Sequence, residues 1–142
     1  MAMTMHLDIV SAEESIFSGP INEVYASSVA GELGIFPRHT QLLSQLAPGE
    51  VRFKPEGKQE LEHYYVGGGI IEVQPHIVTV LADTVIRAKD LDEAKALEAK
   101  QRAEEAMRER REEEDFARAQ AELIQAEAQL RLIKNLRREI KG

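Results

Sequence analysis

The chain lacks cysteine, long apolar runs and a signal-peptide core. Without cysteine, disulfides and thiol chemistry are excluded and a reducing compartment is permitted. No apolar run approaches the roughly 20 residues that a helix needs to span a bilayer, and the N-terminal residues lack the apolar core of a signal peptide. We therefore expect a soluble chain that reaches a membrane only indirectly, through a partner.

Signals for a catalytic or metal site are also scarce. The histidines are His6, His39, His63 and His76. They show neither the short spacing of a helical metal pair nor a cysteine companion, so no zinc site is expected. The run Gly67-Gly68-Gly69 precedes a strand-like segment and no Lys-Ser/Thr, which favours a bulge or tight strand connection over a phosphate loop. The acidic run 112–115 is interpreted as a solvated turn, so an enzyme is the weakest functional class and no metal or cofactor is expected.

The formal net charge of -7 is unevenly distributed. Residues 1–88 carry 5 basic and 11 acidic side chains, whereas residues 89–142 carry 13 and 14. Within the second part, residues 129–142 hold five basic side chains and one acidic side chain. A basic tip on an otherwise acidic protein indicates an acidic protein surface as partner, because a nucleic-acid binder would usually be basic across a whole face.

The first 88 residues have the pattern of an antiparallel β domain. Clusters of glycine, proline and other turn formers recur at short intervals and separate segments of strand length and composition. The predicted strands span residues 5–10, 21–29, 51–54, 61–66, 70–73 and 77–81. Many short strands with regular turns favour a sandwich or a flattened barrel.

The pattern changes near Asp90 to that of two helices. Asp90 is predicted to be the N-cap of the first helix, with Glu93 completing a capping box, and Asp115 is predicted to cap the second. The apolar residues then recur at helical spacing on each segment. We therefore predict an α+β chain, with a β domain over residues 1–88 and an antiparallel helical hairpin over residues 89–142.

Alanine dominates the apolar stripes of this hairpin. The first helix presents Ala96, Ala99, Ala103 and Ala106, with Met107 beside them. The second helix has two stripes, one with Phe116, Ala119, Leu123, Ala126, Leu130 and Ile133, and one with Ala117, Ala121, Ile124, Ala128 and Leu132. Burying an alanine methyl contributes about 0.8 kcal/mol, against roughly 2 to 3 for leucine. Such a hairpin is held weakly enough to undock, although a permanently docked two-helix cap remains the alternative.

The segment from Gly31 to His39 stands apart, because its apolar side chains lie between glycines and a proline. Solvated loops are normally polar, so a loop of this composition indicates a contact with a partner. A buried turn that closes the β domain is the alternative, and the composition alone leaves both open.

Several strings in this chain together resemble a known family. They are Leu7-Asp8-Ile9-Val10-Ser11-Ala12-Glu13, Phe17-Ser18-Gly19, Gly31 to Pro37 with His39, Gly68-Gly69-Ile70-Ile71-Glu72-Val73, Val78-Thr79-Val80-Leu81-Ala82-Asp83-Thr84 and Asp90-Leu91-Asp92. Each string is weak alone, but in this order they are highly specific. On these residues the chain closely resembles, over nearly its full length, the bacterial epsilon subunits of F-type ATP synthases.

The resemblance implies a ten-stranded sandwich followed by a helical hairpin, in a non-catalytic subunit of the central rotor stalk. Such a subunit binds the gamma subunit, rests on the c-ring and couples proton flow to ATP synthesis. It would lie at the cytoplasmic face of the bacterial inner membrane, held there by other subunits and without a cofactor.

Position by position, the resemblance also implies docking residues. Those expected to face the c-ring are Gly31, Glu32, Leu33, Gly34, Ile35 and Phe36. Those expected to lie toward gamma are Ser11, His39 and Ser44. None of these residues is expected to perform chemistry.

In the family the hairpin can open, rise toward the alpha and beta subunits and block ATP hydrolysis. Two apolar stripes on the second helix suit two environments, and an alanine seam leaves a small free-energy gap between states. The cations expected to meet the beta subunit are Arg108, Arg110, Arg111, Arg118, Arg131, Lys134, Arg137 and Arg138.

Some members of the family bind ATP in the folded hairpin through a Leu/Ile-Asp-x-x-Arg-Ala motif. Here Asp92 matches, but Lys95 replaces the arginine and loses its planar donor geometry. Arg102 matches a further family arginine, whereas the two expected on the second helix fall at Gln125 and Gln129. Weak or absent nucleotide binding is expected.

Two other classes remain open. A free-standing helical adaptor would explain the tail but not the segment from Gly31 to His39. A nucleotide-sensing module would need the two missing arginines.

Overall fold

The computed structural model describes residues 3–109 and 113–141. The chain divides into two compact units, one ending at Arg87 and one beginning at Ala88. The first unit consists of strands and the second of helices. A β domain followed by a two-helix region, as the sequence predicts, is thereby confirmed.

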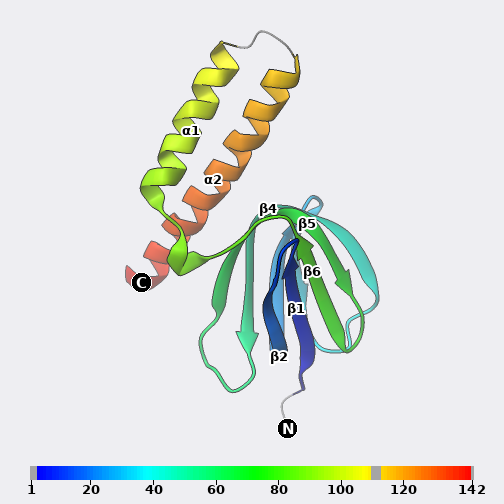
Figure 1. The fold of residues 1–142 in the computed structure, drawn as a ribbon. Helices are drawn as coiled ribbons and strands as arrows, with labels where there is room; N and C mark the ends of the chain where they lie inside the picture. Colours follow the sequence, from blue (N-terminus) through cyan, green and yellow to red (C-terminus); the bar gives the residue numbers. More distant parts are fainter. Residues whose placement is uncertain (1–2, 110–112, 142) are drawn as a thin grey trace. The chain divides into compact units, whose positions relative to one another are not determined.

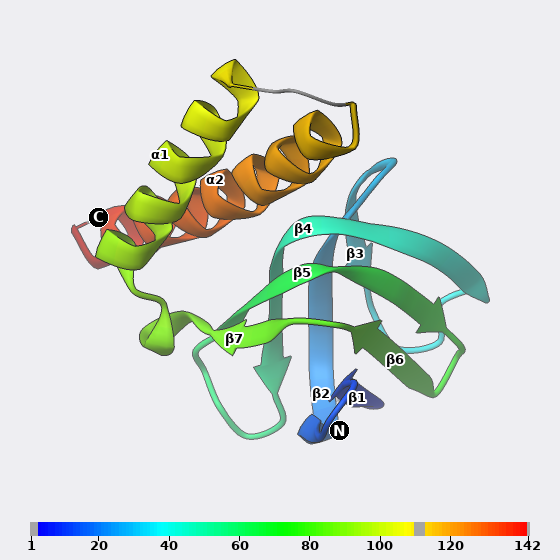
Figure 2. The ribbon, with the colours of Figure 1, turned by 45° about the horizontal axis from the view of Figure 1, so that its top comes forward.

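The β unit is built from one sheet. Its strands are β1 (Met5–Ser11), β2 (Ser15–Ser28), β3 (Gly31–Ile35), β4 (Leu42–Pro55), β5 (Glu62–Val73), β6 (Ile77–Ala82) and β7 (Val85–Arg87). The strand order is β1-β6-β5-β4-β2-β3, and β7 pairs with β5. Because β1 also pairs with β2, five of the strands close into a barrel, and β3 lies outside this ring beside β2 (Figures 1 and 2). The β1–β6 pair is parallel and the other pairs are antiparallel.

The expected number of about ten strands is wrong, since the described residues form seven. Three clusters that were interpreted as turns lie inside continuous strands: Ser18-Gly19-Pro20 in β2, Ala47-Pro48-Gly49 in β4 and Gly67-Gly68-Gly69 in β5. Glycine and proline here accommodate bends and register shifts in long strands, which serve more than one side of the barrel. β2 and β4 accordingly have 14 residues each, well above the length of an average strand.

Gly69 shows why the glycine run does not end β5. Its φ is +143°, and a Cβ atom at this position would lie 2.1 Å from the carbonyl oxygen of Leu81. Only glycine therefore lets β6 approach β5 this closely. The run lies inside β5 and so does not form the predicted connection between strands, and no helix follows it as a phosphate loop would require.

The core of the β unit follows from the two-residue period of its strands. Leu7 and Ile9 of β1, Ile71 of β5 and Val80 of β6 are fully buried. Phe53 anchors an aromatic group, with its ring centroid 4.5 Å from that of Phe17 and 5.4 Å from that of Tyr64. All members of this core cluster come from the first unit.

The second unit contains a short 3-10 turn, η1 (Ala88–Asp90), and two helices, α1 (Glu93–Arg108) and α2 (Glu113–Lys141). The helices lie side by side and antiparallel (Figures 1 and 2), which confirms the predicted hairpin. No helix in the described ranges is long and apolar enough to cross a membrane.

Both predicted helix caps are wrong. Asp90 ends the 3-10 turn, and the N-cap of α1 is Asp92, whose extended backbone lets Oδ1 accept a hydrogen bond of 3.2 Å from the Lys95 backbone N–H. The sequence offers two aspartates two residues apart, and the preceding turn selects the second. Asp115 lies within the first turn of α2, because the helix already includes Glu113.

Part of the predicted alanine stripe is buried. Ala96 and Ala103 of α1 and Ala119 and Ala126 of α2 are each at most 3% exposed. Ala106 is exposed, so the stripe does not extend to the end of α1. The buried residues are small, and the stabilisation gained from their burial is correspondingly modest.

Candidate interaction surfaces

The first five residues of the segment from Gly31 to His39 form an edge strand. Gly31–Ile35 is β3, which pairs antiparallel with β2. These five residues are therefore neither the loop nor the buried turn that the composition had suggested, whereas residues 36–39 belong to the connection between β3 and β4. The strand has one inward and one outward side, so its residues differ in what they offer to a partner.

Four of the six predicted c-ring-facing residues are exposed: Gly31, Glu32, Gly34 and Phe36. Phe36 is 51% exposed, and Leu33 is half-buried and packs against the core. The side chain of Ile35 is 1% exposed and belongs to the core. This side chain is thus not available to a partner, because Ile35 pairs with the buried Val24 on the inward side of the sheet.

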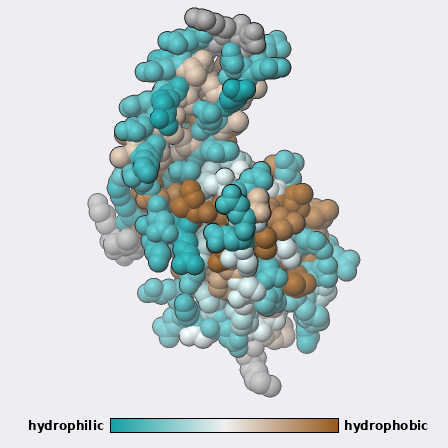
Figure 3. Space-filling model, in the orientation of Figure 1, coloured by the Kyte–Doolittle hydropathy of each residue, from teal (hydrophilic) through white to brown (hydrophobic). Residues whose placement is uncertain are grey.

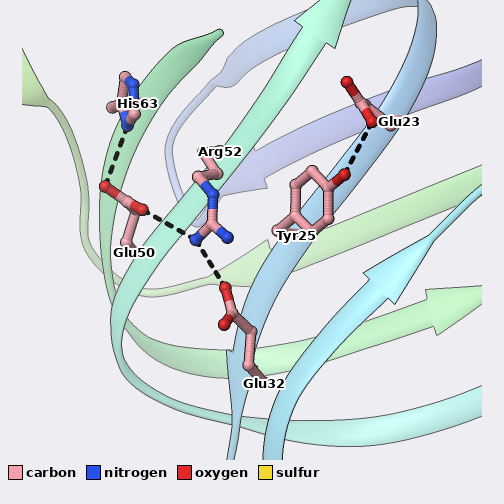
Figure 4. A network of polar contacts seen from close by, with 6 residues as sticks. All are labelled: Glu23, Tyr25, Glu32, Glu50, Arg52 and His63. Atoms are coloured by element: carbon pink, nitrogen blue, oxygen red, sulfur yellow. Dashed lines mark hydrogen bonds and ion pairs between the residues drawn. The ribbon is translucent and has the colours of Figure 1, made fainter. Parts of the chain in front are cut away.

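Beside β3 lies a polar network centred on Arg52 of β4 (Figure 4). The guanidinium donates to Glu32 across 2.6 Å and to Glu50 across 3.1 Å. It also lies 4.6 Å from the centroid of the Tyr25 ring. Glu50 in turn contacts Nδ1 of His63 at 3.0 Å. The network joins residues from four neighbouring strands.

The electrostatics of this network follow from partial burial and opposed charge. Burial raises the pKa of Glu50, but the hydrogen bonds and charges of His63 and Arg52 outweigh it and leave the pKa below its usual range. Burial lowers the pKa of Arg52, but the hydrogen bonds that its guanidinium donates to Glu32 and Glu50 raise the pKa overall. The hydrogen bond to Glu23 raises the pKa of Tyr25. Arg52 is therefore a permanent cation held between two carboxylates.

The three predicted gamma-facing residues come from different elements. Ser11 ends β1, half-buried, and its Oγ donates to the Glu14 carbonyl at 3.2 Å. His39 lies between β3 and β4, and its Nδ1 is 2.6 Å from the Thr40 carbonyl oxygen. Ser44 pairs with the buried Ile71, so its side chain is on the inward side of β4.

The same sheet has an apolar outer surface that was not predicted from the sequence. Ile70 pairs with Leu81, and Leu81 pairs with Val10, which places the three side chains in one row across β5, β6 and β1. Ile70 is 47% and Leu81 48% exposed, and Leu43 of β4, on the same side of the sheet, is 70% exposed. Figure 3 shows hydrophobic surface on the β unit, in contrast to the mostly hydrophilic helices.

A hollow of about 360 Å³ borders this apolar row. It is lined by Val10, Ser11, Ala12, Gly69, Ile70, Leu81, Ala82 and Asp83. Ser11 is thereby brought next to exposed leucine and isoleucine side chains. The sequence did contain a signal for this surface, because apolar residues occur on both faces of β5 and β6. Only the pairing of the strands, however, shows that the outward-facing apolar residues lie in one row.

Six of the eight predicted beta-contacting cations lie in the described residues. Arg108, Arg118, Arg131, Lys134, Arg137 and Arg138 are exposed on the helices. Arg110 and Arg111 lie outside the described residues. Arg137 is engaged by Glu93 of α1 in a two-pronged ion pair, one contact of which measures 3.3 Å. This pair joins the end of α2 to the start of α1.

The residues proposed for weak nucleotide contact all belong to α1 or its cap. Lys95 and Arg102 are exposed, and Asp92 is exposed but serves as the N-cap of the helix. One carboxylate oxygen of Asp92 is thus already used by the backbone. Among residues 3–109 and 113–141, no group of acidic, histidine or cysteine side chains is arranged to hold a metal.

Two family models together match residues 4–134 of the chain. Residues 4–88 match the ATP synthase delta/epsilon chain β-sandwich domain, and residues 89–134 match the long α-helix domain of the same chain. The ATP synthase epsilon chain of Nitrosococcus oceani is 59% identical over 141 residues, covering 99% of each chain. That of Thioalkalivibrio sulfidiphilus is 59% identical over 138 residues, covering 97% of this chain and 98% of the relative.

Solved structures show the same fold at low sequence identity. A chain of the Euglena gracilis mitochondrial ATP synthase, in a structure containing F1 and the c-ring, superposes with a TM-score of 0.72 at 22% identity. The match covers 96% of this chain and 81% of that one. A chain of the Tetrahymena thermophila central stalk and c-ring structure gives 0.53 at 17% identity, covering 63% and 70%. The chain therefore belongs to the family of ATP synthase epsilon chains, the non-catalytic accessory subunits of that complex.

Proposed function

We propose that the chain is a central-stalk subunit of a bacterial F-type ATP synthase that couples rotation of the c-ring to ATP synthesis. The observation that carries this proposal is the near full-length identity of 59% to bacterial ATP synthase epsilon chains. The two structural neighbours come from assemblies that contain the c-ring and, in one case, the central stalk, which supports the same role. The subunit would be held at the cytoplasmic face of the inner membrane by its partners.

Two surfaces of the β unit are suited to two partners. Glu32 on the exposed side of β3 and Phe36 directly after this strand offer a charge and an aromatic ring to the polar loops of the c-ring. The apolar row of Ile70 and Leu81, with Leu43 near it, offers a dry surface to gamma. Exposed apolar side chains of this size on one sheet face are typical of a protein interface.

Ser11, His39 and Ser44 would complete the gamma interface. Ser11 lines the hollow beside the apolar row, and His39 follows β3 in the chain. Ser44 would act through the backbone or the end of β4, since its side chain is directed inward. Leu43, its outward-facing neighbour, is the better candidate for a direct contact.

The hairpin would supply regulation. In this proposal α1 and α2 open, extend along gamma and meet the alpha and beta subunits, where the exposed cations of α2 contact acidic side chains of beta. The small buried alanines of the hairpin support this, because they leave the folded state with a modest free-energy advantage. The extended helix would then inhibit ATP hydrolysis without affecting coupling.

Deleting residues 90–142 tests the regulatory part. ATP hydrolysis by the assembled enzyme is expected to rise, while ATP-driven proton pumping persists because the β unit keeps both docking surfaces. Unchanged hydrolysis would remove the inhibitory role and leave the coupling role intact. If the full chain does not form a stoichiometric complex with the gamma subunit, the coupling role itself fails and a helical adaptor becomes the better description.

A further inference from the structure

The backbone hydrogen bonds of β3, the strand expected to face the c-ring, are by themselves only a weak attachment to the sheet. β3 has five residues and pairs with β2 on one side, outside the closed ring of the barrel. Short edge strands of this kind have few backbone hydrogen bonds to hold them. Side-chain contacts must therefore fix the orientation of Glu32 and Phe36.

The strand register brings those contacts together on one face. Gly34 pairs with Tyr25, Tyr25 with Arg52, and Arg52 with His63, so one row of residues runs across β3, β2, β4 and β5. Residues two positions away share the same side of a strand. Glu32 is therefore beside Gly34 on this side, as Glu50 is beside Arg52.

Arg52 contacts Glu32 of β3 directly (Figure 4) and is linked to Phe36, the residue after β3, through Tyr25. Its guanidinium contacts the Glu32 carboxylate directly at 2.6 Å. It also stacks on Tyr25, whose ring meets Phe36 edge-on at a centroid distance of 6.1 Å. Gly34 lies against this ring, since a Cβ there would be at contact distance, 3.4 Å, from two atoms of Tyr25.

Arg52 is itself fixed in place. Glu50 holds it from the same strand at 3.1 Å and is held in turn by His63 of β5 at 3.0 Å. The side chains of His63, Glu50 and Arg52 are 13%, 18% and 28% exposed, whereas Glu32 is 54% exposed. The network thus begins at largely buried side chains on strands of the closed barrel and ends at the exposed side chain of Glu32 on the edge strand.

We propose that Arg52 is a positioning residue that orients Glu32 and Phe36 for contact with the polar loops of the c-ring. This inference rests on the proposed function. One guanidinium nitrogen, Nη1, contacts both carboxylates while the planar group stacks on the Tyr25 ring, and a lysine ammonium lacks this planar stacking geometry. Arg52 acts through its neighbours and does not itself touch the partner.

The test compares binding of the full-length chain to two preparations of the enzyme. One is the membrane-bound synthase depleted of this subunit, which contains gamma and the c-ring. The other is the detached catalytic part depleted of this subunit, which contains gamma without the c-ring. Arg52→Gln is expected to weaken binding to the membrane-bound enzyme about fivefold, the change that about 1 kcal/mol produces, and to leave binding to the detached part unchanged.

Two further variants and one further measurement make the result specific. Lys54→Gln removes the same charge two residues along β4 and is expected to bind both preparations as the wild type does. Arg52→Lys is expected to recover only part of the lost affinity. In hydrogen-exchange measurements on the free subunit, Arg52→Gln should speed exchange of the β3 amides while leaving the core strands protected.

Phe36→Asp separates failure of this inference from failure of the proposed function. If Phe36→Asp weakens binding to the membrane-bound enzyme and Arg52→Gln does not, the positioning role is overturned and the c-ring contact stands. If neither variant has an effect, the c-ring contact of this segment is overturned as well. If Arg52→Gln weakened binding to both preparations equally, this would show a general structural defect and would also overturn the inference.

Discussion

Glu50 illustrates what single residues decide in the β unit. It lies between Arg52 and His63 with its side chain 18% exposed. A carboxylate in such a position is stable only when its charge is compensated, since burial alone favours the protonated form. The interactions with His63 and Arg52 are together strong enough to hold the pKa of Glu50 below its usual range.

This shift predicts a specific acid sensitivity. Because the folded-state pKa of Glu50 is depressed, its contribution to stability is present above the unfolded value of 4.5 and is lost as the pH falls through the folded pKa. The Glu50→Gln variant should therefore be less stable than the wild type at pH 7. The difference between their free energies of unfolding should narrow below pH 4.5.

Urea unfolding of both proteins between neutral and acidic pH measures this difference. A gap that stays constant as the pH falls would mean that the carboxylate charge of Glu50 contributes nothing to folding.

At the scale of elements, the hairpin is held by small contacts. Its buried alanines gain little from burial, and the ion pair between Glu93 and Arg137 joins the start of α1 to the end of α2. The two side chains of this pair are 47% and 60% exposed, so solvent screens it and its contribution is modest, about 1 kcal/mol at most. Even so, a modest contribution matters when two states differ by only a few kcal/mol.

Breaking the ion pair from the α1 side should favour the open hairpin. Glu93→Gln removes the partner while leaving Arg137 free to contact the beta subunit in the extended state. ATP hydrolysis by the assembled enzyme is expected to fall by up to about fivefold, as the population shifts toward the inhibited form. Steady-state hydrolysis at matched subunit occupancy is the measurement.

The matched control is Glu98→Gln, which removes an exposed carboxylate from the same helix without touching Arg137. It should leave hydrolysis at the wild-type level. If Glu93→Gln and Glu98→Gln behave alike, the ion pair does not govern hairpin opening.

At the scale of the whole molecule, the two units have separate sources of stability. The core cluster of the β unit is drawn entirely from residues up to Val85, whereas the buried side chains of the described part of the helical unit are alanines and one leucine, Leu132. A unit with its own aliphatic and aromatic core is expected to fold alone. The helical unit, with few large buried side chains, has less to stabilise it.

A chain that ends at Arg87 should therefore fold cooperatively. Its circular dichroism should show strands without helix, and its urea midpoint should lie close to that of the β unit in the full chain. It should also keep its complex with gamma, because both proposed docking surfaces are retained. Loss of a cooperative transition would show that the helices are needed for the β core.

Much of this architecture was predictable because it depends on local pattern. The change of period near Asp90, the two-residue alternation of the strands and the helical spacing of the alanines all act over a few residues. They predicted a β domain and a helical hairpin correctly. Ambiguous local signals led to wrong predictions. The N-cap of α1 is Asp92 and not Asp90. Clusters of glycine and proline bend strands that these clusters were expected to end.

The sequence by itself determined the two-part chain, the absence of thiol chemistry and the family to which the chain belongs. Only the tertiary structure decided that Ile35 turns into the core while Phe36 stays outside, and that Leu43, Ile70 and Leu81 share one outer surface. It also decided that Arg52 meets Glu32. The physical reason is that strand register brings together residues far apart in the chain, and register is set by the packing of the closed barrel and not by local sequence.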